Sequence, residues 1–386
     1  MNAAAIIGPG PIFLKKEDIF KEKGLFQANN NVYIGMFFIY KYFPTLNKAD
    51  FMVWIKRILK VFLTLTLASV FFLLLCYKND FPREKIIAKY LSPESQFIDI
   101  DGVRVHVRIM GEGEPIVLLH GSFSSLFTWE AWQFALSPYF RTIAIDLPGH
   151  GLTEPDSLKR YTQSDYALLV LRLTEELHIS EFHLVGNSMG GAVALELASK
   201  RPDRVLSLGL IDSSGTSSIK SNDKNFAAKR GGGWIFTVLD NPILSKILLS
   251  CTPRFLFEMN LKEVYANSEK VSPEIIDRYY ELLLVAGNRQ ATLDRMAGPK
   301  ESNIEFEKIV MPTLILWGEK DQWIPLEQGV RLQEAISGSN LVVFENAGHV
   351  PMEEIPTESV GEYLAFLGVE LRKTYFGRQP ILTYAN

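Results

Sequence analysis

This sequence has little cysteine and no excess of positive charge. Only two cysteines, Cys76 and Cys251, occur among 386 residues, whereas disulfide-stapled domains and cysteine metal clusters need several closely spaced ones. The 40 Lys and Arg residues are outnumbered by 44 Asp and Glu, which leaves a formal net charge of −4. We therefore expect neither a disulfide framework nor a nucleic-acid partner.

Cofactor signatures are missing as well. No tight group of His, Cys and Asp has the spacing of a metal site, and no G-x-G-x-x-G motif follows an expected strand. The GGGW run at Gly231–Trp234 lies among helical patterns and is interpreted as a flexible hinge. The sequence therefore predicts no metal and no bound cofactor.

One stretch lacks charge for long enough to cross a bilayer. Residues 58–77 read ILKVFLTLTLASVFFLLLCY, and Lys60, near one end, is their single charge. About 20 residues at helical rise span the hydrocarbon layer. A buried core helix is the alternative, but the run lies far from the rest of the core pattern. The residues that follow do not suit a signal-peptidase site, so we predict an uncleaved, single-pass signal anchor.

The orientation and start of this N-terminal region are weakly determined. Basic residues flank the anchor on both sides: Lys56, Arg57 and Lys60 before it, and Lys78, Arg83 and Lys85 after it. The positive-inside rule slightly favours a cytoplasmic amino terminus, with the rest of the chain on the non-cytoplasmic side. Within the N-terminal segment 1–57, Met52 begins a short basic lead, MVWIKRILK. One hypothesis is that translation starts there, and a detected peptide from residues 1–50 would contradict it.

After an expected linker at 78–95, short apolar runs alternate with longer helical patterns. The runs are VRVHVRI, PIVLLHG, RTIAIDLPG, FHLVGNS, LSLGLIDS, TLILWGEKD and LVVFENAGH. This alternation predicts an α/β fold with a mostly parallel sheet and helices on both faces, formed by residues 96–215 and 311–372. Residues 216–310 interrupt it with helical patterns only, so we expect a helical cap over the carboxyl edge of the sheet.

The stretch Gly186–Gly190, GNSMG, has the G-x-S-x-G pattern between an expected strand and a helix predicted over Met189–Lys200. Glycines allow a turn tight enough to expose the hydroxyl of Ser188 above the sheet. A serine hydroxyl attacks only when a base takes its proton. Ser188 is therefore the candidate nucleophile, and the prediction depends on a histidine.

Of the six histidines, only His349 follows the last expected strand on a loop that reaches the same edge, so it is the candidate base. Asp321, after the preceding strand, gives the chain order Ser, Asp, His and is favoured as the acid that orients it. Asp212 could reach the same place from the strand before, and its alternative role is a turn residue. The backbone amides of Ser122 and Met189 are the candidate oxyanion donors.

Together these motifs resemble the α/β-hydrolase family over residues 96–367. The resemblance rests on HGS at His120, DLPGHG at Asp146, GNSMGG at Gly186, GEKD at Gly318 and AGH at Ala347. It implies a Ser188, Asp321, His349 triad, an oxyanion hole from Ser122 and Met189, and a helical cap. Epoxide hydrolases and haloalkane dehalogenases of this family carry an aspartate at the nucleophile position, so Ser188 disfavours both.

The elbow GNSMGGA is also similar to the carbon–carbon bond hydrolases that act on meta-cleavage products of aromatic rings. Those relatives have an HGGGPG loop and a tryptophan after the histidine, whereas this chain has HGSFSS and Val350. We therefore predict a membrane-anchored serine hydrolase that cleaves small hydrophobic ester or acyl substrates through an acyl-enzyme. A carbon–carbon bond hydrolase or an acyltransferase on the same triad, and a binding protein on a retained fold, are the alternatives. The sequence does not determine the oligomeric state.

Overall fold

The computed structural model describes residues 48–219, 241–299 and 304–369. It divides into two units, Met1–Phe72 and Leu73–Asn386. Three features of the sequence interpretation lie outside the described residues: most of segment 1–57, the proposed hinge at Gly231–Trp234 and residues 370–372. The two units are therefore described one at a time.

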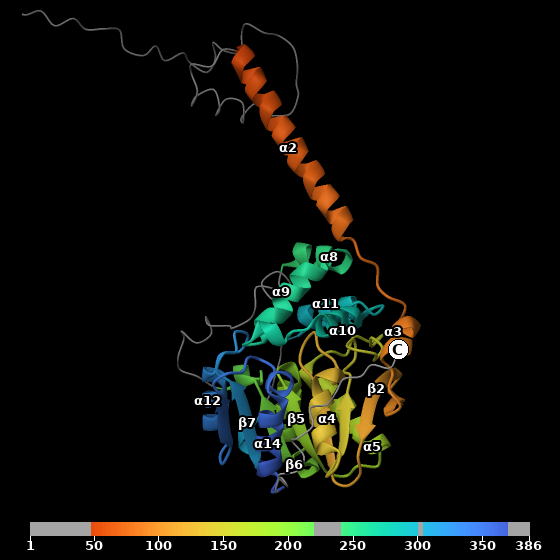
Figure 1. The fold of residues 1–386 in the computed structure, drawn as a ribbon, viewed down its shortest axis with the longest axis vertical. Helices are drawn as coiled ribbons and strands as arrows, with labels where there is room; N and C mark the ends of the chain where they lie inside the picture. The colour runs from red at the N-terminus through yellow and green to blue at the C-terminus, as the bar shows by residue number, and fades with distance from the viewer. Residues whose placement is uncertain (1–47, 220–240, 300–303, 370–386) are drawn as a thin grey trace, which may run out of the picture. The chain divides into compact units, whose positions relative to one another are not determined.

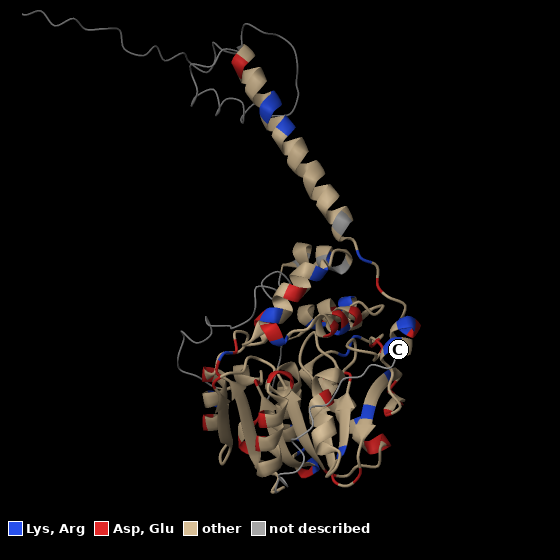
Figure 2. Ribbon diagram, viewed as in Figure 1, with Lys and Arg blue, Asp and Glu red and all other residues tan. Residues whose placement is uncertain are grey.

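The N-terminal helix α2 spans Lys48–Cys76 and begins ten residues before the expected start at Ile58. Charged residues near a helix end do not interrupt its backbone hydrogen bonds, so the helix includes the basic lead. An 18-residue window within Ala49–Leu74 has a mean hydropathy of 2.0, so this stretch is long and apolar enough to cross a membrane. Figure 2 shows its charges confined to its first half. The hydroxyls of Thr64, Thr66 and Ser69 each donate to the carbonyl four residues earlier.

The second unit is built on an eight-stranded sheet of order β1-β2-β4-β3-β5-β6-β7-β8. From β4 to β8 neighbouring strands are parallel, whereas β1 and β2 form an antiparallel edge. The strands are β1 Ser95–Ile100, β2 Val103–Met110, β3 Pro115–Leu119, β4 Arg141–Ile145, β5 Phe182–Asn187, β6 Val205–Ile211, β7 Thr313–Gly318 and β8 Asn340–Phe344. The mostly parallel sheet is confirmed; β1 was missed because SQFIDI is too polar to read as a buried strand.

Helices cover both faces of the sheet, because alternate residues of each strand point to opposite sides. In β3, Val117 and Leu119 join a cluster with α5 and α6, whereas Ile116 and Leu118 join one with α4 and α14. Figure 1 shows α8, α9, α10 and α11 gathered beyond one end of the strands. The helices are α3 Arg83–Tyr90, α4 Glu130–Leu136, α5 Gln163–Glu176, α6 Met189–Lys200, α8 Pro242–Ser250, α9 Arg254–Val264, α10 Pro273–Leu283, α11 Asn288–Ala297, α12 Glu327–Ala335, α13 Pro351–Glu354 and α14 Pro356–Phe366.

The segment expected to be a linker at 78–95 is folded. It contains α3, whose Ile86 is buried in the core. The guanidinium of Arg83 donates to the carbonyls of Leu152 and Thr153 at 2.9 and 3.1 Å and to that of Ala286 at 3.0 Å. The sequence did not indicate this helix, because a short helix with one buried apolar residue leaves almost no periodic signal.

The glycines around Ser188 are required by close packing rather than by unusual torsion angles. A Cβ on Gly186 would lie 2.3 Å from the carbonyl oxygen of Gly190, and one on Gly190 would lie 2.3 Å from that of Leu119. Neither glycine has a positive φ; Ser188 itself has φ 52° and ψ −116°. The start of α6 therefore lies directly against the end of β3, which places Ser188 beside the loop after that strand.

Replacing Gly190 by alanine should destabilise this packing, because backbone atoms cannot move away as a flexible side chain can. We expect Gly190→Ala to lower the free energy of unfolding by about 2 kcal/mol or more. Chemical denaturation measures the difference. Gly298→Ala is the matched control, since its nearest non-neighbouring atom would be 3.3 Å away. Equal stability of Gly190→Ala and wild type would contradict the packing argument.

Candidate functional site

Ser188 lies at the sharp turn between β5 and α6, in a conformation that L-residues rarely adopt. Its backbone is held on both sides: its N–H donates to the carbonyl of Ile211 at 3.1 Å, and its carbonyl accepts from the N–H of Ser214 at 3.0 Å. A strained residue persists only when its surroundings over-determine it, and such strain concentrates at functional sites. The turn places Ser188 directly after the carboxyl end of β5.

Two backbone donors lie on either side of Ser188. Met189 occupies the first position of α6, where its N–H has no intrahelical acceptor. The Ser122 N–H donates to no backbone or side-chain acceptor in the described part of the chain. A Cβ on Gly121 would lie 3.0 Å from the Cβ of Ser188, so the Ser122 loop passes directly beside the serine. Unused N–H groups in this arrangement can stabilise a developing oxyanion.

His349 is hydrogen-bonded to Asp321, with 2.6 Å between Nδ1 and Oδ2. The other carboxylate oxygen of Asp321 accepts the N–H groups of Trp323 and Ile324 at 2.7 and 3.0 Å. An ionised carboxylate only accepts, so Nδ1 of His349 carries the proton and Nε2 keeps its lone pair. That Nε2 is buried and has no hydrogen-bond partner among the described residues, Ser188 included. The distance between a catalytic histidine and its nucleophile is commonly longer before substrate binds.

The loop that carries His349 is joined to the cap. The N–H of His349 donates to the carbonyl of Val264, the last residue of α9, at 2.8 Å. The buried carboxylate of Glu354 accepts three N–H groups, from Gly348 at 2.8 Å, Ala266 at 3.0 Å and Asn267 at 2.7 Å. The sequence did not indicate Glu354, because the second glutamate after His349 belongs to no recognised motif. Cap and histidine loop therefore form one hydrogen-bonded assembly.

A cavity opens between these loops and the cap. On the sheet side it is bounded by Ser122, Asn187 and His349, and on the cap side mainly by apolar or aromatic side chains. The cap residues are Phe257, Asn260, Leu261, Val264 and Tyr279. Pockets of this kind, apolar with a few convergent polar groups, are typical of small-molecule sites.

An arginine of the cap, which sequence reasoning also missed, reaches the same loop. Nη2 of Arg295 in α11 donates to Oγ of Ser122 at 3.1 Å. Burial lowers the pKa of the Arg295 guanidinium, and no carboxylate of the described residues forms an ion pair with it. A positive charge without a nearby negative partner therefore lies beside the candidate oxyanion donors.

The chain matches a known family over most of this unit. Residues 114–356 match the family described as alpha/beta hydrolase fold. This chain belongs to that family. It is 29% identical over 281 residues to an uncharacterized hydrolase, YugF, of Bacillus subtilis, with 71% of this chain and 97% of the relative covered. It is 27% identical to the 2-hydroxymuconate semialdehyde hydrolase of a Pseudomonas species, with 68% and 91% covered.

One solved structure is similar to this α/β hydrolase over a longer part of the chain. It is that of a membrane phospholipase A, described as a bacterial virulence factor, and it is 25% identical with a TM-score of 0.58. The alignment covers 81% of this chain and 98% of that one. The expected resemblance and fold class are therefore confirmed.

Asp212, the alternative acid, lies in the same cluster but is bonded differently. Its Oδ1 accepts the N–H of Gly318 at 2.9 Å, and its Oδ2 is buried without a hydrogen-bond partner among the described residues. Burial and the neighbouring charge of Asp321 raise the pKa of Asp212 well above its usual range. The carboxyl of Asp212 therefore holds its proton more strongly than an exposed aspartate does.

The cluster also corrects one expectation drawn from sequence spacing. Ligand atoms of Asp212, Asp321 and His349 lie within 4.8 Å of one another, a grouping that could hold a metal ion, whereas the sequence had suggested no such group. Folding brings them together from three strand ends. A hydrogen bond between His349 and Asp321 already joins two of the three groups.

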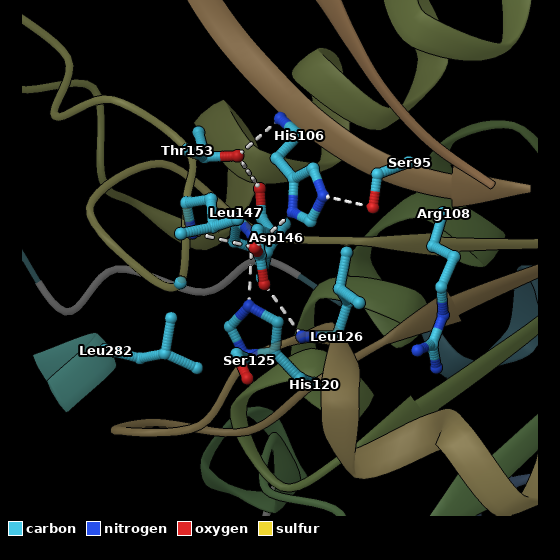
Figure 3. Close-up of polar contacts among 12 residues, drawn as sticks. Ser95, His106, Arg108, His120, Ser125, Leu126, Asp146, Leu147, Thr153 and Leu282 are labelled. Carbon is cyan, nitrogen blue, oxygen red and sulfur yellow. Dashed lines mark hydrogen bonds and ion pairs between the residues drawn. The ribbon is translucent and has the colours of Figure 1, made fainter. Parts of the chain in front are cut away.

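A second Ser, His, Asp arrangement lies elsewhere in the unit (Figure 3). Asp146 Oδ2 is 2.7 Å from Nδ1 of His106, whose Nε2 is 3.0 Å from Oγ of Ser95. Asp146 also accepts the N–H groups of Leu126 and Leu152 at 2.7 and 2.8 Å, which ties two loops together. Burial alone would raise the pKa of Asp146, but His106 holds it below its usual value. His106 and Asp146 are both 0% exposed, and Asp146 is engaged by the backbone of two loops, so we assign this group to structure.

The protonation of Asp212 makes stability depend on pH in a defined direction. Its folded-state pKa is raised, so the native state keeps a proton that the unfolded chain releases above pH ~4. Wild type should therefore lose stability relative to Asp212→Asn as pH rises, by as much as about 1 kcal/mol per pH unit. Thermal unfolding at intervals from pH 4.5 to pH 8 tests this.

Asp203→Asn is the control for that series, because Asp203 is fully exposed and carries a lowered pKa. Its stability difference from wild type should show no such rise with pH. Parallel pH curves for Asp212→Asn and wild type would mean that Asp212 is ionised in the folded protein.

Proposed function

We propose that this α/β hydrolase is a membrane-anchored serine hydrolase that cleaves carboxylic esters through an acyl-enzyme. Ser188 attacks the ester carbonyl, and Nε2 of His349 takes its proton and returns it to the leaving alcohol. Asp321 holds the tautomer and stabilises the imidazolium, and the amides of Ser122 and Met189 bind the oxyanion. The observation that carries the proposal is the buried, unpartnered Nε2 of His349, fixed by Asp321 at the cavity that Ser122 also lines.

The cavity supports a hydrophobic ester or acyl substrate. Its cap side presents Phe257, Leu261 and Val264, and a buried apolar wall favours an acyl chain over a charged one at that place. The similarity to a membrane phospholipase A agrees with acyl esters as the substrate class. Arg295 would add electrostatic stabilisation where negative charge develops next to Ser122.

Residues 49–74 support anchoring in a membrane. None of the most apolar part of this helix is buried within the structure, so its large side chains have no protein partner there. The back-bonded hydroxyls of Thr64, Thr66 and Ser69 suit an environment without water. We place the hydrolase unit on the non-cytoplasmic side, following the charge bias of the flanking residues.

A carbon–carbon bond hydrolase is the second candidate, because the GNSMGGA elbow resembles that group and several relatives are named as hydrolases of 2-hydroxy-6-oxo acids or of 2-hydroxymuconate semialdehyde. One is the 2-hydroxymuconate semialdehyde hydrolase, at 27% identity. Val350 replaces the tryptophan expected after the histidine in that group, and it is buried against the cavity. Turnover of a vinylogous diketone acid without turnover of simple esters would favour this candidate over ours. Acyl transfer to an acceptor other than water would use the same residues.

Labelling with a fluorophosphonate tests the nucleophile. We expect one adduct on Ser188, mapped by peptide mass spectrometry, and hydrolysis of p-nitrophenyl esters of graded chain length. Ser188→Ala should lose the adduct and lower kcat by at least ~10³-fold, because nothing else can form the acyl-enzyme. Ser95→Ala is the matched control, since Ser95 contacts a second His–Asp pair, His106 and Asp146, which we assign to structure. Folded protein with neither adduct nor ester turnover would support a binding role instead.

Two charges in the middle of α2 should abolish its membrane insertion. Leu65→Arg with Leu67→Arg adds about 3 kcal/mol per residue to the apparent insertion free energy. Wild type and the paired control Leu65→Ala with Leu67→Ala should remain in the membrane pellet after alkaline carbonate extraction, and the arginine variant should move to the supernatant. Wild-type protein released by carbonate would refute the anchor.

A further inference from the structure

The two cysteines of the chain meet in the folded protein. Tyr77 and Cys251 form an antiparallel β-bridge, and the N–H of Lys78 donates to the carbonyl of Ser250 at 2.8 Å. Cys76 therefore adjoins the bridge on one strand and Cys251 lies on the other. Both belong to the same unit, Leu73–Asn386.

Further contacts hold the segment after Cys76 against the cap. Arg289 of α11 donates to the carbonyl of Lys78 at 2.7 Å and forms an ion pair with Asp80 at 2.6 Å. Phe81 exchanges backbone hydrogen bonds with Leu284 and Ala286, at 2.7 and 3.0 Å. The approach of the two cysteines is therefore one end of a longer interface, not an isolated contact.

The thiols differ in exposure. Cys76 is half-buried at the end of α2, beyond the span Ala49–Leu74, whereas Cys251 is 6% exposed at the end of α8. Burial, and then contact with the Cys76 thiol, raises the pKa of Cys251 to about 11. Cys76 is therefore the thiol that a soluble reagent meets first.

We propose that Cys76 and Cys251 form a disulfide that joins the chain leaving α2 to the cap helix α8. The oxidant is a small-molecule disulfide or a disulfide-donating protein, available outside the cytoplasm. The thiolate of Cys76 attacks one sulfur of the oxidant, forms a mixed disulfide and releases one thiol. Cys251 then loses its proton, attacks the sulfur of Cys76 and releases the second thiol. The oxidant is reduced to two thiols as the two cysteines are oxidised to one bond.

The bond would restrain the cap. It closes a loop from residue 76 to residue 251 that contains β1 to β6, and a cross-link over so long a loop restricts the unfolded chain strongly. It would also keep α8 beside the chain that enters the hydrolase unit. This restraint does not depend on which bond the enzyme hydrolyses, so it can be tested separately from the proposed activity.

Thiol counting on the full-length protein in detergent tests the disulfide. One sample is incubated with oxidised glutathione and one with a phosphine reductant, and both are unfolded in N-ethylmaleimide. We expect two maleimide adducts on the reduced protein, none on the oxidised protein, and a cross-linked peptide pair containing Cys76 and Cys251. Oxidation should also raise the Tm of wild type by ~4 °C or more.

Cys76→Ser and Cys251→Ser serve as separate controls. Neither should form the cross-linked pair, and the Tm of both should be insensitive to oxidation. Three results on folded wild type would overturn the proposal: two adducts after oxidation, glutathione bound at both cysteines, or disulfides formed only between two copies of the chain.

Discussion

The strained backbone of Ser188 is the constraint on which the site depends. A positive φ at a residue with a side chain costs about 1–3 kcal/mol and is kept only by surrounding contacts. Here those contacts are the hydrogen bonds to Ile211 and Ser214, together with the close packing of Gly190 against Leu119, which leaves no room for a Cβ. The same approach of α6 to the end of β3 brings the Ser122 loop beside the serine. The packing that holds Ser188 in its strained conformation therefore also positions the candidate oxyanion donors.

The roles of Asp321 and Asp212 depend on how two neighbouring buried carboxyl groups are hydrogen-bonded. Two carboxylates within a few ångströms cannot both ionise at low cost, so one remains neutral. Asp321 receives two N–H groups and the imidazole, whereas Asp212 receives only the N–H of Gly318. The carboxyl with more donors is the one that holds the imidazole. This difference in hydrogen bonding, which chain order alone does not show, distinguishes Asp321 from the alternative acid.

The sequence predicted the parts of the fold that have strong local signals. Seven apolar runs became strands, and α6 begins and ends where the residues predicted. The pairing of His349 with Asp321 also followed from strand order. The features that the sequence did not indicate depend on contacts between distant segments: β1, α3, Arg295 and Glu354. Their residues resemble those of an ordinary exposed surface. The meeting of Cys76 and Cys251 is of the same kind, since nothing local to either cysteine indicates the other.

Two groups of Ser, His and Asp in one chain show that the three residue types do not make a reactive site by themselves. At Ser95 the imidazole of His106 already contacts the hydroxyl, but His106 and Asp146 are fully buried, and Asp146 accepts hydrogen bonds from the backbone of two loops. At Ser188 the hydroxyl and the imidazole are not yet joined, and the lone pair of His349 is buried without a partner. An unsatisfied buried acceptor carries a cost of about 1–3 kcal/mol. In the proposed mechanism this lone pair is used when His349 accepts the proton of Ser188.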